Sequence, residues 1–242
     1  MSPLDTVLVV LCSVAGFTLQ GAVGFGMGIL GSPLLLLIDS RFVPGPILAS
    51  TMVFTGLLTL RERHAVDLNG VRWLIAGRFA GTIPAAAVLA VLPAEQLSLV
   101  FGAMVLLAVA ISVSGLQVEP RPAALLAGGA LSGLMGTIAA VGGPPLALLY
   151  QHAPGARVRG TLSSVFLVGT VMSLTALVLV GRFGPDELSL SLTLLPGVVV
   201  GFFLSRRIAS RLDQGYTRRA VLSVAAVAGL IVVGRYFAAS GL

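Results

Sequence analysis

Eight apolar runs divide most of the chain, and their lengths constrain the fold more than any other feature. They cover residues 4–38, 46–60, 72–92, 95–115, 122–150, 160–181, 188–206 and 217–238. A helix needs about 20 predominantly apolar residues to cross a bilayer, and most of the runs approach or exceed that length. Only 10% of the residues are charged, whereas a soluble domain carries about 25%. The sequence therefore predicts an all-α integral membrane protein with several spans.

The first run is unusual because glycines interrupt it in the stretch QGAVGFGMGILGSPLLLLI, residues 20–38. Each glycine destabilises a helix interior by roughly 1 kcal/mol relative to alanine. The run is also far longer than one span needs. Both properties are explained if the segment folds back on itself inside the membrane, and the run 122–150 offers the same possibility.

The arginines distinguish a single crossing from a hairpin, because every basic residue of the chain is an arginine. If each long run crosses once, the loop arginines divide six against eight. If both runs reverse, eleven fall on one side: Arg61, Arg63, Arg72, Arg121, Arg157, Arg159, Arg206, Arg207, Arg211, Arg218 and Arg219. Only Arg41, Arg182 and Arg235 fall on the other. Cytoplasmic loops carry an excess of basic residues, so the count favours two hairpins.

An internal repeat supports this interpretation. A shift of 112 residues aligns Gly21 with Gly133, Gly24 with Gly136, and Pro33 with Pro145. After an eight-residue insertion, Gly77 and Gly81 fall on Gly197 and Gly201. We therefore expect a first membrane repeat over 1–115, a connecting loop over 116–121 and a second membrane repeat over 122–242.

The hairpins determine the orientation of the two repeats. Each half then contains a broken-helix hairpin and three transmembrane helices, so the halves lie upside down relative to each other. Inverted repeats with interrupted helices are typical of secondary transporters, whose binding sites lie near the midplane. This topology places both termini on the non-cytoplasmic side of a multi-pass protein, which we expect in a bacterial inner membrane.

The two glycine-rich breaks are candidate binding sites. Ser32-Pro33 has the pattern of an N-cap followed by a first-turn proline, and Gly143-Pro144-Pro145 is similar. Half-helices that begin at mid-membrane direct unpaired N–H groups and a positive dipole end toward the break, which favours an anion. The alternative is that the glycines only allow close helix packing. We prefer that alternative for Gly77, Gly81, Gly197 and Gly201, because small residues four apart are a helix-packing pattern.

Polar side chains could complete such a site. Hydroxyl and amide groups that could face the same space are Gln20, Ser50, Thr51, Thr137, Ser163 and Ser164, although each could equally bond a neighbouring helix. Arg78 is the only charged residue inside a predicted span. Its side chain either reaches back to the cytoplasmic face or forms the cationic partner of a substrate, and the sequence favours neither.

Other functions lack the residues they need. No Asp, Glu or His lies in the middle of a predicted span, which argues against a metal site, an intramembrane protease and a carboxylate proton relay. We therefore expect the protein to have no enzymatic activity and to bind neither a cofactor nor a metal. The net charge is +6, but the arginines lie in short connections, as topology charges do, and we expect no nucleic-acid partner.

The stretch QGAVGFGMGILGSPLLLLI resembles the N-terminal signature of the sulfite exporter TauE/SafE family of permeases, also called toluene-sulfonate uptake permeases. SGLMGTIAAVGGPPLALLY resembles its second-half counterpart, although Ser132 stands at the position of Gln20. The resemblance spans nearly the whole chain and implies transport of sulfite or organosulfonates. By position, Gln20, Gly21, Gly24, Phe25, Gly26, Pro33, Gly142, Gly143, Pro144 and Pro145 match the family's pattern.

The residues and the resemblance together predict a secondary transporter that holds a small oxyanion between the two breaks. The alternatives are a permease for another small anion and a non-transporting assembly or scaffold protein. H⁺ or Na⁺ is a possible coupling ion, and the sequence sets neither the transport direction nor the oligomeric state. The expected site comprises Gln20, Gly24, Gly26, Gly28, Ser32, Pro33, Thr51, Arg78, Thr137, Gly142, Gly143, Pro144, Ser163 and Ser164.

Overall fold

The computed structural model describes residues 1–212 and 216–239, with the side chains of 94–95, 210–212, 216–220 and 239 left out. Over the described residues the chain is helical and contains no strand. The first half comprises α1 (Pro3–Val23), η1 (Met27–Gly31), α2 (Ser32–Ile38), η2 (Ser40–Phe42), α3 (Gly45–Glu62), η3 (Arg63–Ala65), α4 (Leu68–Val91) and α5 (Ala94–Val113). The second comprises α6 (Pro122–Ala139), α7 (Gly143–Leu149), α8 (Gly155–Leu179), α9 (Pro185–Leu192), α10 (Leu195–Leu212) and α11 (Tyr216–Ala239).

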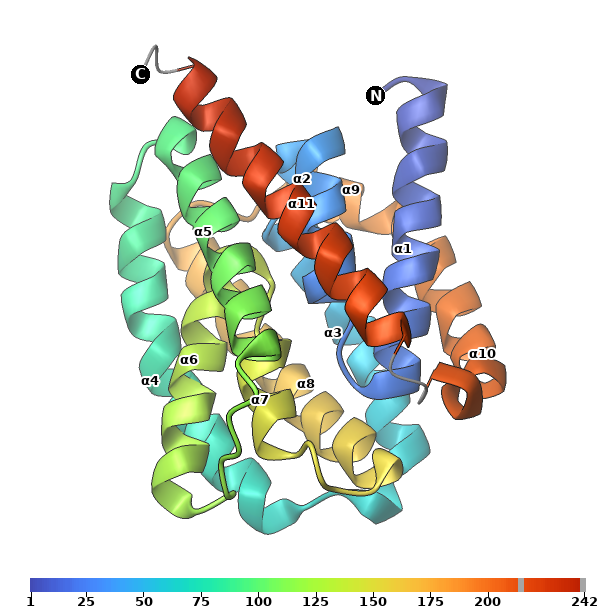
Figure 1. Ribbon diagram of the computed structural model, residues 1–242. Coiled ribbons are helices and arrows are strands. Elements are labelled where there is room, and N and C mark those ends of the chain that lie inside the picture. Colours follow the sequence, from blue (N-terminus) through green and yellow to red (C-terminus); the bar gives the residue numbers. More distant parts are fainter. Residues whose placement is uncertain (213–215, 240–242) are drawn as a thin grey trace.

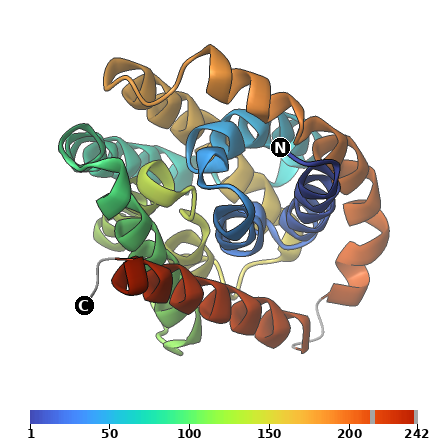
Figure 2. The same cartoon turned by 90° about the horizontal axis from the view of Figure 1, so that it is seen from above.

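The chain reverses direction at both glycine-rich breaks (Figure 1). It descends through α1 and returns through η1 and α2, and it later ascends through α6 and returns through α7. The N-terminus and the last turn of α11 consequently lie at one end of the molecule, which faces the viewer in Figure 2. The first hairpin lies near the middle of the surrounding helices in that view. The long runs 4–38 and 122–150 are therefore hairpins.

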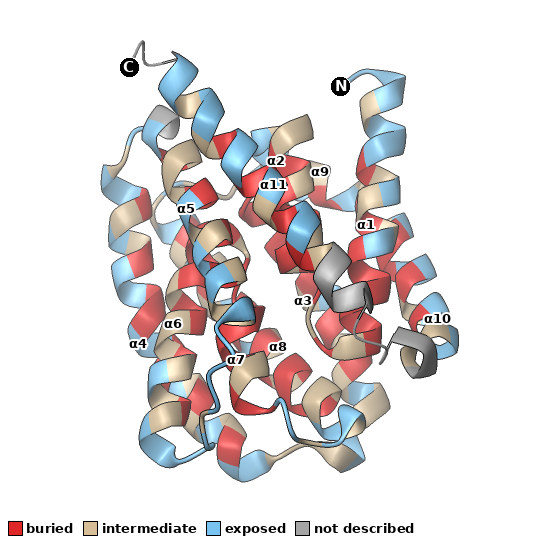
Figure 3. Ribbon diagram, viewed as in Figure 1, coloured by how far each residue is buried: buried red, intermediate tan, exposed pale blue. Residues whose placement is uncertain are grey.

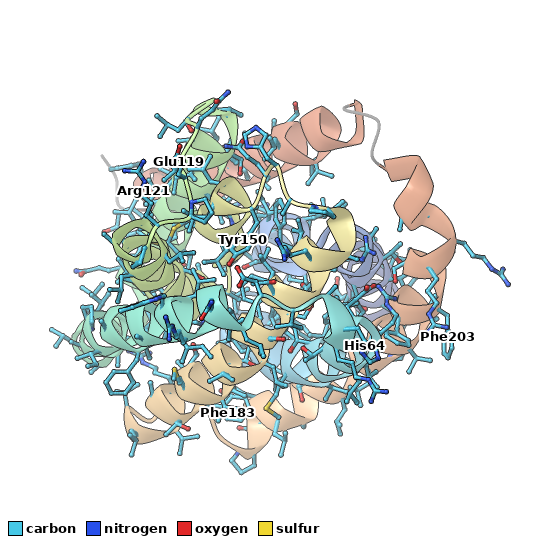
Figure 4. The ribbon with its side chains drawn as sticks, turned by 90° about the horizontal axis from the view of Figure 1, so that it is seen from below. His64, Glu119, Arg121, Tyr150, Phe183 and Phe203 are labelled. Atoms are coloured by element: carbon cyan, nitrogen blue, oxygen red, sulfur yellow. The ribbon has the colours of Figure 1, made fainter. Side chains whose placement is uncertain are left out.

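The end opposite the termini carries most of the charge. It holds η3 and the connections 114–121 and 150–154, from which Figure 4 labels His64, Glu119, Arg121 and Tyr150. The arginines that the two-hairpin topology places together on one side belong to helix ends and connections at this end of the molecule. We call it the arginine-rich end. The side chains of Arg211, Arg218 and Arg219 lie outside the described residues.

Six of the described helices are long and apolar enough to cross a membrane, namely α1, α4, α5, α6, α8 and α11. The run 188–206 differs from a single span, because α9 and α10 meet at an angle of 43°. Pro196 lies in the first turn of α10, where N–H groups have no partner within the helix, so its missing N–H costs nothing. In a continuous helix the same proline would remove a hydrogen bond. Counting this bent pair as one span gives a seventh.

The helix faces have the distribution expected in lipid. Figure 3 shows exposed residues on the outside of the bundle and buried residues toward its middle. Large apolar side chains such as Phe79, Ile83, Phe203 and Leu230 are more than half exposed. Such a surface is unfavourable in water, so the outer faces fit contact with acyl chains.

Glycines allow two helix pairs to approach closely. In α4, Gly77 and Gly81 lie directly against backbone carbonyls of α6, at Leu126 and Ala130. In α10, Gly197 and Gly201 lie against α1, where Ser13 and Phe17 leave no space for a Cβ atom. The packing interpretation of these four glycines is therefore confirmed.

Gly81→Leu is expected to lower the free energy of unfolding by about 2–3 kcal/mol, because the new side chain would meet the backbone of Ala130, which cannot move aside. Thermal unfolding of the purified protein in detergent measures the effect. Gly234→Leu is the matched control, since no atom lies within 4 Å of a Cβ atom at Gly234. Equal melting temperatures for both variants would contradict the close α4–α6 contact.

Candidate functional site

The first break is built by two glycines and one glutamine. Helix α1 ends at Gly24, whose φ of 95° lies in the left-handed region that favours glycine. Gly26 packs against the backbone of Leu19 and Gln20, where a Cβ atom would have no room. The side chain of Gln20 then accepts a hydrogen bond from the Met27 N–H at 3.2 Å. Gln20 therefore fixes the start of the returning half-helix.

The prediction of an N-cap at Ser32 is wrong because Ser32 is already helical, although Pro33 does lie in the first turn of α2. The helix begins five residues earlier at Met27, as the π-helical turn η1, and continues directly into α2. The Ser32 N–H donates to the carbonyl of Met27, five residues earlier, which is the spacing of a π turn. The next residue, Pro33, has no N–H to donate. Ser32 Oγ donates to the Ala139 carbonyl at 2.6 Å and so links the two breaks.

The second break uses different residues. Helix α6 ends at Ala140, an alanine with a φ of 58° in the left-handed region, a conformation that costs of order 1–3 kcal/mol at a non-glycine residue. Ser132 Oγ donates to the Gly142 carbonyl at 2.7 Å, so the counterpart of Gln20 also holds its break. The prediction of several unpaired N–H groups is wrong at α7, because Pro144 and Pro145 have none and Gly143 alone supplies one among its first three residues.

A small cavity of about 30 Å³ lies between the two breaks, which is room for about one water molecule. Eight of the predicted site residues line it: Gln20, Gly26, Gly28, Thr51, Arg78, Gly142, Gly143 and Pro144. The structure thus brings together residues from α1, η1, α3, α4 and α7.

The other predicted residues lie outside this cavity lining, and several bond to helices as structural groups. They are Gly24, Ser32, Pro33, Thr137, Ser163 and Ser164. Ser163 and Ser164 donate to carbonyls four residues earlier in α8, and Thr137 shares hydrogen bonds with Thr82 and Ser173. Ser50, a further candidate, bonds the carbonyls of Pro46 and Ser191.

The expected site does not include seven residues of the cavity wall, of which Phe25 was matched only to the family's pattern: Phe25, Ile29, Leu48, Gly136, Ala140, Phe166 and Thr170. Two signals were available. Gly136 is the repeat partner of Gly24, and Phe166 is the repeat partner of Phe54. Thr170 lies one turn beyond Phe166 on α8, so the two share a face of that helix.

Arg78 is the only charged side chain that lines the cavity, among the described residues. It is 1% exposed, so it does not reach back to a membrane surface. Its Nη1 donates to Ser132 Oγ at 2.8 Å, and the guanidinium carbon lies 5.5 Å from the centre of the Phe166 ring. The absence of side chains at Gly136, Gly142 and Gly169 leaves the space that the guanidinium occupies.

This guanidinium has no carboxylate partner among the described residues. The four ion pairs of that part of the chain involve Arg41, Arg61, Arg121 and Arg159 instead. The Nε atom of Arg78 is buried without a hydrogen-bond acceptor. A buried charge without a partner is strongly unfavourable, so the arrangement favours occupation of the cavity by an anion.

Comparison with known protein families agrees with this chemistry. The family model described as sulfite exporter TauE/SafE matches residues 8–232. The chain belongs to the TauE/SafE sulfite exporter family. No curated protein and no solved structure matches it. The suspected family is thereby confirmed, and the match covers both breaks and Arg78. Its members are membrane transporters, which agrees with a multi-pass protein and with the expected absence of an enzymatic role.

The TauE/SafE chain has a second and larger cavity toward the arginine-rich end. It measures about 530 Å³ and lies between α1, α5, α7, α8 and α11, with Tyr150 and Arg159 in its wall. Phe25, Ile29 and Pro144 line this cavity and the small one alike. These three side chains therefore form the partition between the large cavity, which we call the vestibule, and the cavity at Arg78.

Beside the vestibule, an ion cluster holds the end of α1. Glu62 accepts hydrogen bonds from Arg61 at 3.2 Å and from Arg159 at 3.0 Å. Arg61 also donates to the Gly21 carbonyl at 2.8 Å, and Arg159 to the Ala22 carbonyl at 3.4 Å. Cations at a helix C-terminus stabilise its free carbonyls, so this cluster fixes where α1 stops.

Proposed function

We propose that this TauE/SafE protein is a secondary transporter for sulfite or an organosulfonate, which binds at Arg78 in the cavity between the breaks. The buried guanidinium without a carboxylate partner is the observation that carries the proposal. Donors to oxyanion oxygens come from several directions. Gln20 and Thr51 line the cavity, and the Gly28 and Ile29 N–H groups in the first turn of η1 have no acceptor in their own helix.

The packing of the helices supports an inverted repeat for this transporter. Helix α1 packs on α10 and its repeat counterpart α6 packs on α4, while the counterparts α3 and α8 pack on each other, as do α5 and α11. Reciprocal pairs of this kind are expected if a two-fold axis in the membrane plane relates 1–115 to 122–242. Alternating access then follows from motion of one half against the other around the anion.

The charges suggest the direction of transport. With the arginine-rich end in the bacterial cytoplasm, as the positive-inside rule requires, both termini lie outside and the vestibule opens inward. An anion that leaves a negative interior gains about 2.3 kcal/mol per charge for each 100 mV. Export therefore needs no coupling ion, whereas uptake against this potential would require H⁺ or Na⁺.

Anion flux into proteoliposomes tests the proposal. We expect the purified protein to accelerate uptake of labelled sulfite and of methanesulfonate over protein-free liposomes, with rates that follow an imposed membrane potential. A non-transporting scaffold protein would give no flux of any small anion although it is folded. Flux of other anions with no flux of sulfite or sulfonates would indicate a permease for a different substrate.

A further inference from the structure

The two halves of the chain repeat the glycines at their packing surfaces but not the cation. Arg78 follows Gly77 in α4, and the residue at the corresponding place after Gly197 in α10 is Val198. Val198 is an apolar side chain with 1% exposure. A symmetric transporter would place two guanidinium groups at these corresponding positions, whereas the described part of this chain has only that of Arg78.

The wall of the cavity contains no second ionisable group. The lining residues come from α1, η1, α3, α4, α6, α7, α8 and the breaks, and Arg78 alone among them is charged or titratable. At the vestibule, Arg159 pairs with Glu62, which also pairs with Arg61, and Tyr150 donates to Asp67. The site therefore carries a fixed charge of +1, and this charge does not change with pH near neutrality, since a guanidinium stays protonated.

A buried charge of +1 is balanced by one negative charge. A monoanion gives a neutral pair, while a dianion leaves a net charge of −1 in a membrane interior. An uncompensated buried charge costs several kcal/mol even after relaxation of its surroundings. The cavity wall offers neutral donors such as Gln20 and Thr51 but no second positive charge, and Phe25, Ile29, Leu48 and Phe166 are apolar.

We propose that the site selects monoanionic oxyanions, hydrogensulfite and sulfonates with a single charge, over the dianions sulfite and sulfate. The inference rests on the proposed transport function and specifies the charge of its substrate. An apolar substituent on a sulfonate would face Phe25 and Ile29, which lead to the vestibule. The oxygens would face Arg78, Gln20 and Thr51.

The test uses the full-length protein in proteoliposomes and compares substrates of fixed charge. Methanesulfonate is a monoanion and sulfate a dianion over the whole range around neutral pH. We expect methanesulfonate flux to exceed sulfate flux by at least about tenfold, the ratio that corresponds to 1.4 kcal/mol. Methanedisulfonate, a fixed dianion with the same chemical group, should be excluded to the same degree.

Sulfite supplies a second and independent measurement, because it changes from the monoanion to the dianion near neutral pH. We expect the protein-dependent sulfite flux to fall as pH rises, in proportion to the hydrogensulfite fraction, while methanesulfonate flux stays constant. Protein-free liposomes correct for sulfur dioxide that crosses the lipid. Sulfate or methanedisulfonate flux equal to that of methanesulfonate would overturn the inference but not the transport function. Absence of flux for every anion would instead overturn the proposed function.

Discussion

Arg78→Gln is expected to reduce anion flux by at least about 100-fold. Loss of one member of a buried, hydrogen-bonded charge pair costs about 2–5 kcal/mol in binding, and a factor of 100 corresponds to about 2.7 kcal/mol. Glutamine retains a donor that can reach toward Ser132 but removes the charge. Initial rates of methanesulfonate uptake into proteoliposomes measure the effect.

The same substitution is not expected to destabilise the fold. Arg78 has no carboxylate partner among the described residues, so its replacement leaves no opposite charge buried and uncompensated. Arg41→Gln is the matched control, because Arg41 pairs with Asp39 at an exposed position on the termini side, and it should transport normally. Arg78→Lys should retain part of the flux, since it keeps the charge but not the planar donor group. A folded Arg78→Gln protein with wild-type flux would contradict an anion site at this residue.

The hairpin topology could be predicted from sequence because charge and length constrain it together. Run 4–38 is too long for one span, and the distribution of arginines is biased only if both long runs reverse. Neither signal depends on side-chain packing. Both depend on general properties of the bilayer, namely its thickness and the preference for basic loops on the cytoplasmic side. The sequence therefore predicts the breaks around Gly24 and Gly142 without knowledge of any contact.

The details of each break could not be predicted in this way. Pro33 resembles the first-turn proline of a new helix, but the returning helix already begins at Met27. Its first turn is a π turn, in which the Ser32 N–H donates to the Met27 carbonyl. The equivalent turn is absent at α7, so the repeat is unequal where the backbone reverses. The periodicity of the sequence does not distinguish a π turn before the half-helix from a direct α-helical start, because both expose the same residue types.

The environment of Arg78 also depended on tertiary structure. From sequence, a lone arginine in a span fits either a surface-seeking side chain or a binding group. Gly136 and Gly169, from two other helices, provide the space that keeps the guanidinium inside. Conversely, Ser163 and Ser164 are polar but bond their own helix. Which hydroxyl faces a cavity depends on helix rotation, and an apolar helix with lipid on one face and protein on the other gives little periodic signal.

Phe25→Ala is expected to open the partition between the vestibule and the cavity at Arg78. Phe25 lines both cavities and packs on Gly143, where its Cβ leaves no space for a side chain. A cysteine at Thr51, in a protein whose native Cys12 is replaced by serine, then reports access from the vestibule. In the protein with Phe25 intact, the reagent reaches this cysteine only after a local opening, which we take to cost about 3 kcal/mol. Loss of the Phe25 ring should remove this cost and speed modification by a membrane-impermeant thiol reagent about 100-fold.

Two comparisons make the Phe25 result specific. Phe203→Ala in the same cysteine background removes a phenyl ring that is 63% exposed on the outside of α10, and it should leave the labelling rate unchanged. Reagent applied from the arginine-rich end should give the acceleration, whereas reagent from the side of the termini should not, because Phe25 separates the cavity at Arg78 from the vestibule. An unchanged rate in folded Phe25→Ala protein would mean that anions reach Arg78 by another route. Faster labelling together with a faster, potential-driven methanesulfonate leak would identify Phe25 as the inner gate.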